Sequence, residues 1–555
     1  MSDGEFMGER LRIAYVKGED VKLEVESYNG VNPTEVLVDW RINKYGWGNR
    51  VVYKYVDERG DFRGDITYKD LLIRSSQVGN LLKEIDVDLE DRVLIMLPDS
   101  PEAIYSILGS MRIGAWPVII PVNITANYLE YYLNDSRAKV LIIHERFKPL
   151  LYEIKGKLRY LKHVIVVGEI KGDEIRFDDA FKEPENLEPV PYSIDDIAFW
   201  LYSSGTTGMP KGTMHTARTL YYNPIVRFSI YNFRDDDITF SASKLGFAYG
   251  FENTFIAPLW YGVTAILFEG QPTDNEIMLK ILSNYGVTIF FAPPLIYNRL
   301  INYIESKGLK VTLKLRLCAS AGEALPPITY HRWKSMFNVD ILDGIGTTET
   351  CLFTSNRPGK VKPGSGGIPL RGVEVKIVDE NGNIVSVNTP GRIMVKSPTT
   401  AIGYWHRYND TKEKFQGDWV YTGDLGYIDE DGFIWHLGRV DDMIKSAGQW
   451  VSPLEIESII LKHPAVQEVA VVQSFSEDGI GAPKAFIVLK PNYTPSKELA
   501  EEIKEFVKNE IKVSYKVPRW IEFVSELPKT STGKIQRYIL RNIERERYEK
   551  LIRGK

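Results

Sequence analysis

One loop rich in glycine and hydroxyl groups is the part of this sequence best suited to hold an anion. The stretch SSGTTGMPKGT spans Ser203–Thr213 and includes Lys211. Glycines let backbone N–H groups approach a phosphate closely, and the hydroxyl and ammonium groups add donors. It is not the common P-loop, because Pro210 precedes the lysine and Gly212 follows it, where that motif needs Gly-Lys-Ser/Thr. Taken alone, such a cluster is more often a flexible surface loop, so the rest of the sequence must decide between the two.

Four further stretches follow that loop in a fixed order. They are SAGEAL (320–325), DGIGTTE (343–349), YTGDLG with GRVDDMIKSAG (421–448), and PKTSTGKIQR (528–537). With the loop, they resemble the signature of the adenylate-forming superfamily, which includes acyl-CoA synthetases, carrier-loading adenylation domains and beetle luciferases. In detail they are most similar to the benzoate-CoA and 2-aminobenzoate-CoA ligase branch. The resemblance implies an AMP-forming carboxylic acid–CoA ligase, with ATP, Mg²⁺ and coenzyme A as cofactors.

The resemblance also assigns the ATP site. Attack of a carboxylate on the α-phosphate joins two anions, so the transition state needs concentrated positive charge. Lys534 is implied as the lysine that bridges the acyl oxygen and the phosphate. Glu349 is implied as the ligand of Mg²⁺, a cation that takes oxygen donors and substrate phosphates. Asp424 and Arg439 would bind the ribose. The other implied ATP-binding residues are Ser203, Ser204, Gly205, Thr206 (also a metal ligand), Thr207, Gly208, Lys211, Gly322, Glu323, Ala324, Asp343, Gly344, Ile345, Gly346, Thr347 and Thr348.

One of these positions departs from many relatives. Ile345 stands where an aromatic side chain often stacks on the base, so adenine would rest on a less selective aliphatic face.

A rotation of a small domain between the two half-reactions is implied as well. Asp441, counted among the catalytic residues, matches the family's hinge, and hinges are typically a few residues that absorb a φ/ψ change. The rotation would withdraw Lys534 and present the segment around Gly448 to coenzyme A. The implied CoA residues are Lys445, Gly448, Gln449 and Trp450. Without the flanking motifs, a solvated charged linker would explain Arg439–Asp441 equally well.

The acid is expected to be aromatic, of the benzoate or 2-aminobenzoate type. By resemblance, the residues that line its pocket are Phe247, Ala248, Tyr249, Ala321, Gly346 and Leu352. The aromatic ones could equally belong to the core, which is their usual place. Relatives that act on benzoate tend to carry a histidine shortly after the Thr-Glu pair, and Thr350–Phe353 has none. Pocket shape discriminates small acids poorly, so a short or medium aliphatic acid, or a hydroxy acid such as 4-hydroxybutyrate, stays open.

Two alternatives to a CoA ligase stay open: one uses a different thiol acceptor, and the other has no catalytic activity. An adenylation enzyme that loads a carrier protein is one, although the pocket shows no acidic partner for a substrate ammonium. An inactive nucleotide-binding scaffold is the other. The presence of Lys534, Glu349 and Asp424 in their motifs argues against it.

Alternating strand and helix patterns must position these residues. From about Asp91 they predict an α/β fold with mostly parallel sheets and flanking helices. The loop after the strand Ile197–Leu201 lies at a strand's carboxyl end, where open α/β sheets bind ligands, and is expected to lead into a helix around Thr216–Tyr222. A β-rich subdomain follows through Phe433. We expect a large domain over 1–438 and a small, mobile α+β domain over 439–555.

Composition limits the class of protein. The 555 residues are 44% hydrophobic and 26% charged, which is ordinary for a folded globular chain. A net charge of −5 gives no reason to expect a nucleic-acid partner. No apolar run is long enough for a membrane span, and the polar, acidic start MSDGEFMGERL lacks the apolar core of a signal peptide. Cys318 and Cys351 cannot form a disulfide framework, and both are expected to be buried apolar residues. We therefore expect a cytoplasmic enzyme, and a homodimer stays open.

Overall fold

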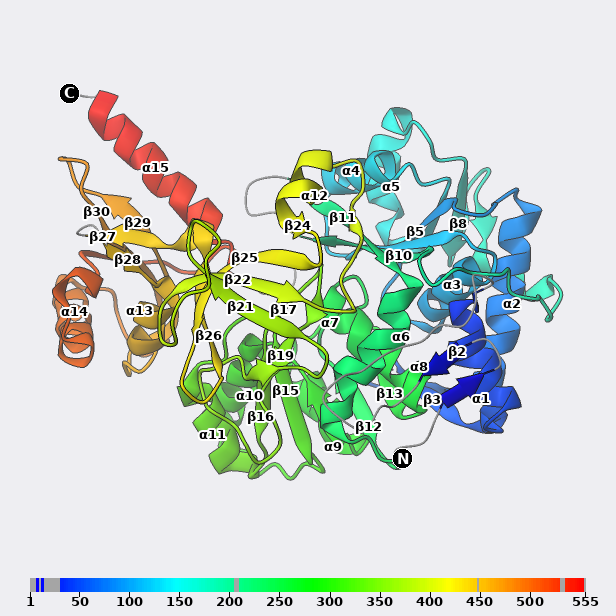
Figure 1. Cartoon of the computed structure of the whole chain (residues 1–555), viewed down its shortest axis with the longest axis horizontal. Coiled ribbons are helices and arrows are strands. Elements are labelled where there is room, and N and C mark those ends of the chain that lie inside the picture. Colours follow the sequence, from blue (N-terminus) through cyan, green and yellow to red (C-terminus); the bar gives the residue numbers. More distant parts are fainter. Residues whose placement is uncertain are drawn as a thin grey trace.

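The first large layer is an eight-stranded sheet that carries the glycine-rich loop. The computed structural model describes residues 6–8, 11–13, 30–203, 209–446, 449–529 and 535–553 (Figure 1). The strands of this sheet run in the order β23-β11-β10-β6-β5-β7-β8-β9. Their bounds are β5 (Arg92–Met96), β6 (Trp116–Ile119), β7 (Val140–His144), β8 (His163–Val167), β9 (Ile175–Arg176), β10 (Ile197–Ser203), β11 (Lys211–Thr216) and β23 (Gly403–Tyr404). The strands from β10 to β9 pair in parallel.

Helices follow these strands as the alternating pattern predicts. They are α3 (Pro101–Arg112), α4 (Ala126–Ser136) and α5 (Lys148–Ile154). Pro101 opens α3 and Gly114 lies just beyond its end with φ +77°, as expected for a helix with these end residues.

The predicted helix is present, but the strand before it was missed. The glycine-rich loop does not lead straight into a helix, because β11 follows it and pairs antiparallel with β10, with Ser203 opposite Lys211. Helix α6 (Ala217–Val226) begins after β11, close to the predicted range Thr216–Tyr222. The other edge of β11 pairs with β23, about two hundred residues later in the chain. A strand stabilised by so distant a partner leaves little trace in the local pattern.

The second large layer is a seven-stranded sheet whose order is β16-β15-β14-β12-β13-β3-β4. Its strands are β3 (Val51–Val56), β4 (Phe62–Thr67), β12 (Ile238–Ser241), β13 (Thr264–Phe268), β14 (Ile289–Phe291), β15 (Leu317–Ala321) and β16 (Ile341–Gly344). All neighbours are parallel except β3 and β4. Helices α2 (Tyr68–Glu84), α9 (Asn275–Asn284), α10 (Pro294–Lys307) and α11 (Pro327–Phe337) flank the sheets. The predicted motifs SAGEAL and DGIGTTE therefore begin in the adjacent strands β15 and β16 and run past their carboxyl ends.

The expected β-rich part is antiparallel. It consists of β21 (Glu374–Val378), β22 (Gly391–Lys396), β24 (Phe415–Gln416), β25 (Trp419–Ile428) and β26 (Ile434–Arg439). Gly382 and Gly432 lie in the turns between these strands with φ of +86° and +81°, a conformation that glycine adopts without strain.

The small C-terminal part is α+β, as predicted, and projects from one end of the molecule (Figure 1). Its sheet is β29 (Val466–Phe475), β30 (Gly481–Leu489) and β31 (Trp520–Phe523), accompanied by the hairpin β27 (Ile444–Ser446) and β28 (Gln449–Val451). Its helices are α13 (Pro453–Ile460), α14 (Lys497–Ile511) and α15 (Arg537–Arg553). Val471, Ile487 and Val507 form part of a separate buried core. Among the described helices none is long and apolar enough to cross a membrane.

Candidate active site

Glu349 is a buried carboxylate held by its neighbours in the ionised form. The Tyr404 hydroxyl donates to its Oε1 at 2.6 Å. Burial alone would raise its pKa, but the positive charge of Lys414 and the Tyr404 hydrogen bond hold that pKa below its ordinary value. An ionised oxygen ligand beside a phosphate site is what Mg²⁺ requires, since this ion usually combines one or two carboxylates with phosphate oxygens and water. The described residues contain no cluster of three or more acidic, His or Cys side chains that would hold a metal alone.

Lys211, at the end of the glycine-rich loop, is fixed by an ion pair. Its Nζ lies 2.5 Å from Oδ1 of Asp410 on helix α12 (Tyr408–Lys414) and 5.3 Å from the ring centroid of Tyr404. Ser203 ends β10 and is buried. The predicted residues Ser204, Gly205, Thr206, Thr207 and Gly208 lie outside the described residues.

A buried histidine supports the loop that carries Glu349. The carbonyl oxygen of Thr348 lies 2.8 Å from Nε2 of His215, and Nδ1 of the same ring lies 3.1 Å from the Thr219 hydroxyl. Burial lowers the pKa of His215 to about 4, so the ring is neutral at physiological pH. Because only a protonated Nε2 can donate to a carbonyl, Nδ1 must accept from Thr219. Thr347 is fixed in turn by a hydroxyl contact of 3.1 Å with Thr350.

Asp424 and Arg439 face each other across the β25–β26 hairpin. The guanidinium Nη1 of Arg439 lies 3.5 Å from Oδ1 of Asp424, and Nε2 of His436 lies 3.3 Å from the same oxygen. Burial would raise the pKa of Asp424, but the hydrogen bond from His436 and the charge of Arg439 hold it at about 2. A fixed, ionised carboxylate of this kind can accept hydrogen bonds from two vicinal hydroxyl groups.

The predicted adenine segments lie side by side. In the register of β15 and β16, Ser320 is opposite Asp343 and Ala321 is opposite Gly344, so Gly322, Glu323 and Ala324 leave the sheet beside Ile345. Asp343 is buried, and burial raises its pKa to about 8. Its Oδ2 accepts from the Leu325 N–H at 3.1 Å, whereas its buried Oδ1 has no partner among the described residues.

The predicted acid residues gather next to these segments. Ala321, Leu352 and Tyr249 belong to one apolar cluster. Gly346 lies directly opposite Leu352, and a Cβ at Gly346 would come within 2.8 Å of the Cys351 carbonyl oxygen, so no side chain fits there. Phe247 precedes the helix α7 (Ala248–Phe251), which carries Ala248 and Tyr249.

A buried polar group lies behind Tyr249. Arg227 and Glu252 form a fully buried ion pair, and the Arg227 guanidinium lies 5.0 Å from the centroid of the Tyr249 ring. The Tyr249 hydroxyl is itself buried and has no hydrogen-bond partner among the described residues. A buried ion pair and an apolar cluster therefore both lie beside Tyr249.

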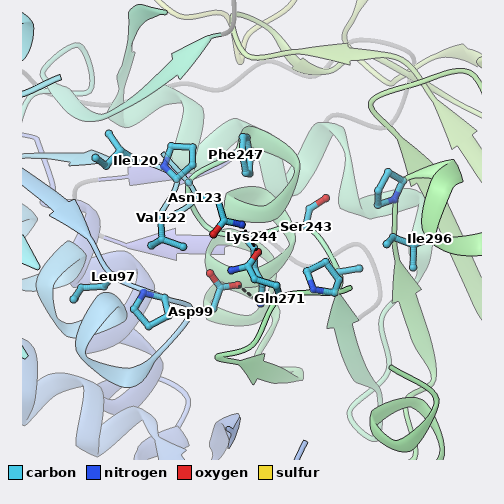
Figure 2. A pocket seen from close by; sticks show the side chains of 16 residues that line it. Leu97, Asp99, Ile120, Val122, Asn123, Ser243, Lys244, Phe247, Gln271 and Ile296 are labelled. Atoms are coloured by element: carbon cyan, nitrogen blue, oxygen red, sulfur yellow. Dashed lines mark hydrogen bonds and ion pairs between the residues drawn. The ribbon is translucent and has the colours of Figure 1, made fainter. Parts of the chain in front are cut away.

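A pocket adjoins the acid region on the side of Phe247 (Figure 2). It lies where strands of the two large sheets end. Its polar lining residues are Asp99, Asn123, Ser243, Lys244 and Gln271, and Phe247, directly before α7, also lines it. The buried Lys244 ammonium lies 3.6 Å from the Asp99 carboxylate.

The predicted residues of the small domain lie at the hinge, on one hairpin, or outside the described residues. Asp441 is exposed in the short turn after β26. Lys445 and Gln449 are exposed on the β27–β28 hairpin, which lies far from α12 along the long axis (Figure 1). Lys534 and Gly448 lie outside the described residues, as does the side chain of Trp450.

Several residues at the site were missed by the sequence reasoning. They are His215, Tyr404, Asp410, Lys414 and His436. The dipeptide Asp431-Gly432 is typical of a hairpin turn, and the hairpin it implies could have indicated His436 near Asp424. Nothing local to residues 404–414 indicates that they lie beside Glu349. Cys318 and Cys351 are buried, as predicted.

Two family models match the chain, one over its large N-terminal part and one over its small C-terminal part. A family model described as AMP-binding enzyme matches residues 39–405, and one for the C-terminal domain of such enzymes matches residues 455–534. Benzoate–CoA ligase from Thauera aromatica is 39% identical over 90% of this chain and 93% of its own length. The 4-hydroxybutyrate–CoA ligase 1 of Metallosphaera sedula is 34% identical over 95% of this chain and 93% of its own length. The crystal structure of an anthranilate CoA ligase in complex with anthranoyl-AMP superposes with a TM-score of 0.87 and 38% identity, covering 93% of this chain and 98% of that one.

Proposed function

From the premise that this chain belongs to the AMP-binding enzyme family, we propose that it is an AMP-forming acid–CoA ligase acting on a benzoate-type aromatic acid. The acid and MgATP give acyl-AMP and pyrophosphate, and coenzyme A then displaces AMP to give the thioester. One observation carries the choice of reaction: Gly346 pairs with Leu352 of the apolar cluster, and three residues later the same segment carries the ionised carboxylate of Glu349. An acid held against Leu352 and Tyr249 therefore presents its carboxylate to the phosphates.

The residues act by charge and position. Glu349 would hold Mg²⁺, which supplies charge neutralisation on the phosphates when it is bound. Asp424 and Arg439 would fix the ribose, and Lys211 would contact the outer phosphates. Lys534 would add the positive charge that the meeting of two anions requires. Such preorganised charges need no rearrangement at the moment of reaction, which is why they lower its barrier.

The thioester step would use a second arrangement of the small domain. We propose that it begins at residue 439 and turns about Asp441. Lys445, Gly448, Gln449 and Trp450 would then reach the site, whereas in the present arrangement strands β27 and β28 lie away from α12 (Figure 1). The pocket beside Phe247 is a suitable path for the pantetheine arm, because Asn123 and Gln271 offer amide groups to its amides.

The acid is aromatic in the relatives named benzoate– and anthranilate–CoA ligases. The pocket residues agree with a flat ring, since Gly346 and Ala321 are small and Tyr249 provides an aromatic face. A second candidate acid is 4-hydroxybutyrate, favoured by the relative from Metallosphaera sedula and by the polar group behind Tyr249.

Pyrophosphate release across a panel of acids tests the proposal. Benzoate, 2-aminobenzoate, phenylacetate, butyrate and 4-hydroxybutyrate are each supplied with MgATP, with and without coenzyme A. We expect the highest kcat/KM for benzoate or 2-aminobenzoate, and thioester only when coenzyme A is present. Preference for 4-hydroxybutyrate selects the second candidate. If none of the acids gives acid-dependent pyrophosphate, the ligase proposal itself is rejected. Turnover that is the same with and without coenzyme A indicates a carrier protein as the acceptor.

A further inference from the structure

Lys414, the last residue of α12, has an ammonium group that the reaction described above does not use. Its Nζ donates to the Thr422 carbonyl oxygen at 2.6 Å, and the side chain is partly buried. An ammonium group carries three N–H donors. In the part of the chain that the structure describes, Thr422 is its one hydrogen-bond acceptor, and no carboxylate forms an ion pair with it. Two donors therefore remain for a further partner.

The surroundings of Lys414 favour an anion as that partner. Burial lowers the pKa of Lys414, while the carboxylates of Glu349 and Asp424 act against that shift and the cations Arg439 and Lys211 reinforce it. Three cations and two carboxylates thus lie around one space. A phosphate entering this space would be repelled by Glu349 and Asp424 unless nearby cations offset them.

Gly423 keeps this space open. A Cβ at Gly423 would lie 3.0 Å from Nη2 of Arg439 and 3.8 Å from Nζ of Lys414, and the φ of this residue is +84°. A side chain at this position would be strained and would crowd both cations. The two positive groups therefore converge next to Asp424, the proposed ribose ligand.

We propose that Lys414 is a phosphate-binding residue that donates to the α-phosphate of the nucleotide in both half-reactions. This inference rests on the proposed function. Helix α12 connects β23 of the first large sheet with β24 of the β-rich part, so Lys414 does not move with the small domain. Lys534 is proposed to leave after adenylation, whereas Lys414 stays.

The thioester step explains why a resident cation matters. Coenzyme A, having lost its thiol proton to solvent, forms a bond from sulfur to the acyl carbon, and the bond from that carbon to the phosphate oxygen breaks. The electron pair of the broken bond stays on the oxygen of AMP. The departing oxygen becomes more negative as the bond breaks, and a nearby ammonium stabilises that charge.

Binding of AMP and of adenosine to the intact protein tests the contact without any acid or coenzyme A. Lys414→Met keeps the length of the side chain and removes its charge. We expect it to weaken AMP about tenfold or more, the usual scale for a charge-assisted hydrogen bond, and to leave adenosine within about twofold. Lys412→Met, an exposed lysine of the same helix, is the matched control and should change neither. Lys414→Arg should recover most of the AMP affinity.

Other outcomes overturn the proposal. Equal weakening of AMP and adenosine means that Lys414 only supports the fold, and no change in either means that it does not touch the phosphate. Thioester formation from supplied acyl-AMP is the second measurement. We expect Lys414→Met to slow it about tenfold, and a normal rate refutes a role in that half-reaction. Failure of the ligase proposal is recognised separately, because it appears as absent acid-dependent pyrophosphate in the unaltered protein.

Discussion

Tyr404 donates its hydroxyl hydrogen to the Glu349 carboxylate at 2.6 Å. Tyr404 ends β23 at the edge of the first large sheet, and Glu349 lies between the short strands β17 (Gly346–Thr347) and β18 (Cys351–Leu352), which form a sheet of their own. The hydrogen bond therefore joins the edge of the first sheet to the segment that carries the proposed metal ligand. It also fixes which carboxylate oxygen remains available to a cation.

Tyr404→Phe should raise the Mg²⁺ concentration needed for half-maximal adenylation about threefold to tenfold, because Glu349 loses the donor that orients it. The measurement is acid-dependent pyrophosphate release against Mg²⁺ at saturating ATP. Tyr408→Phe, an exposed tyrosine on α12, serves as the control. An unchanged Mg²⁺ response would remove Tyr404 from this role.

Asp424→Asn should lower the stability of the folded protein above about pH 4, and this loss of stability should become smaller at lower pH. The pKa of Asp424 is about 2, against 3.8 for an ordinary aspartate, so its ionised form contributes about 2 kcal/mol above the unfolded pKa. That contribution is lost as pH falls from about 4 to about 2. The difference in thermal unfolding midpoint between the two proteins should therefore shrink over this range. A difference that stays constant contradicts the depressed pKa.

Asp343→Asn should show the opposite pH dependence. Burial raises the pKa of Asp343 to about 8, so the folded protein holds a proton that the unfolded chain releases above about pH 4. Stability from this group is complete below the unfolded pKa and is lost as pH rises through about 8. Asn resembles the protonated acid and does not titrate. The thermal midpoint of the variant should rise relative to the unaltered protein between about pH 5 and pH 8, and parallel curves would refute this.

Leu352→Ala should change which acids are accepted. Leu352 is buried and is proposed to line the acid pocket, and removal of its side chain leaves a cavity that costs about 2–5 kcal/mol of stability. We expect kcat/KM for ring-substituted benzoates to rise relative to benzoate. Leu300→Ala removes an equally buried leucine from α10, away from the pocket, and should leave the ratio unchanged. The same ratio in both variants would exclude Leu352 from the pocket.

Lys534→Ala and Gly448→Leu should separate the half-reactions. The lysine variant should lose most adenylation, because positive charge on the α-phosphate is missing, yet form thioester from supplied acyl-AMP. The glycine variant should adenylate and fail to form thioester, because a side chain would block the path of coenzyme A. Pyrophosphate release and thioester formation are measured for each. Equal loss of both activities in either variant contradicts two arrangements of the small domain.

The sequence by itself determined the α/β class, the alternation of strands and helices from Asp91 to the strand Ile197–Leu201, and the presence of a β-rich part. Each depends on local signals, such as the apolar run of β5, the Ser-Pro start of α3 and the Asp431-Gly432 turn. The motif residues Glu349, Asp343 and Asp424 could be named from the sequence because of their resemblance to a known family. The protonation states of these carboxyl groups could not be inferred from the sequence.

Only the tertiary structure decided what surrounds those residues. Tyr404, Asp410 and Lys414 come from a segment some sixty residues from Glu349, and the pairing of β11 with β23 brings them there. The same folding ionises Glu349 and Asp424 and keeps Asp343 protonated, because burial and neighbouring charge are properties of the packed molecule. The sequence pattern reflects the local conformational preferences of the chain, whereas the electric field at a site depends on which distant segments pack together there.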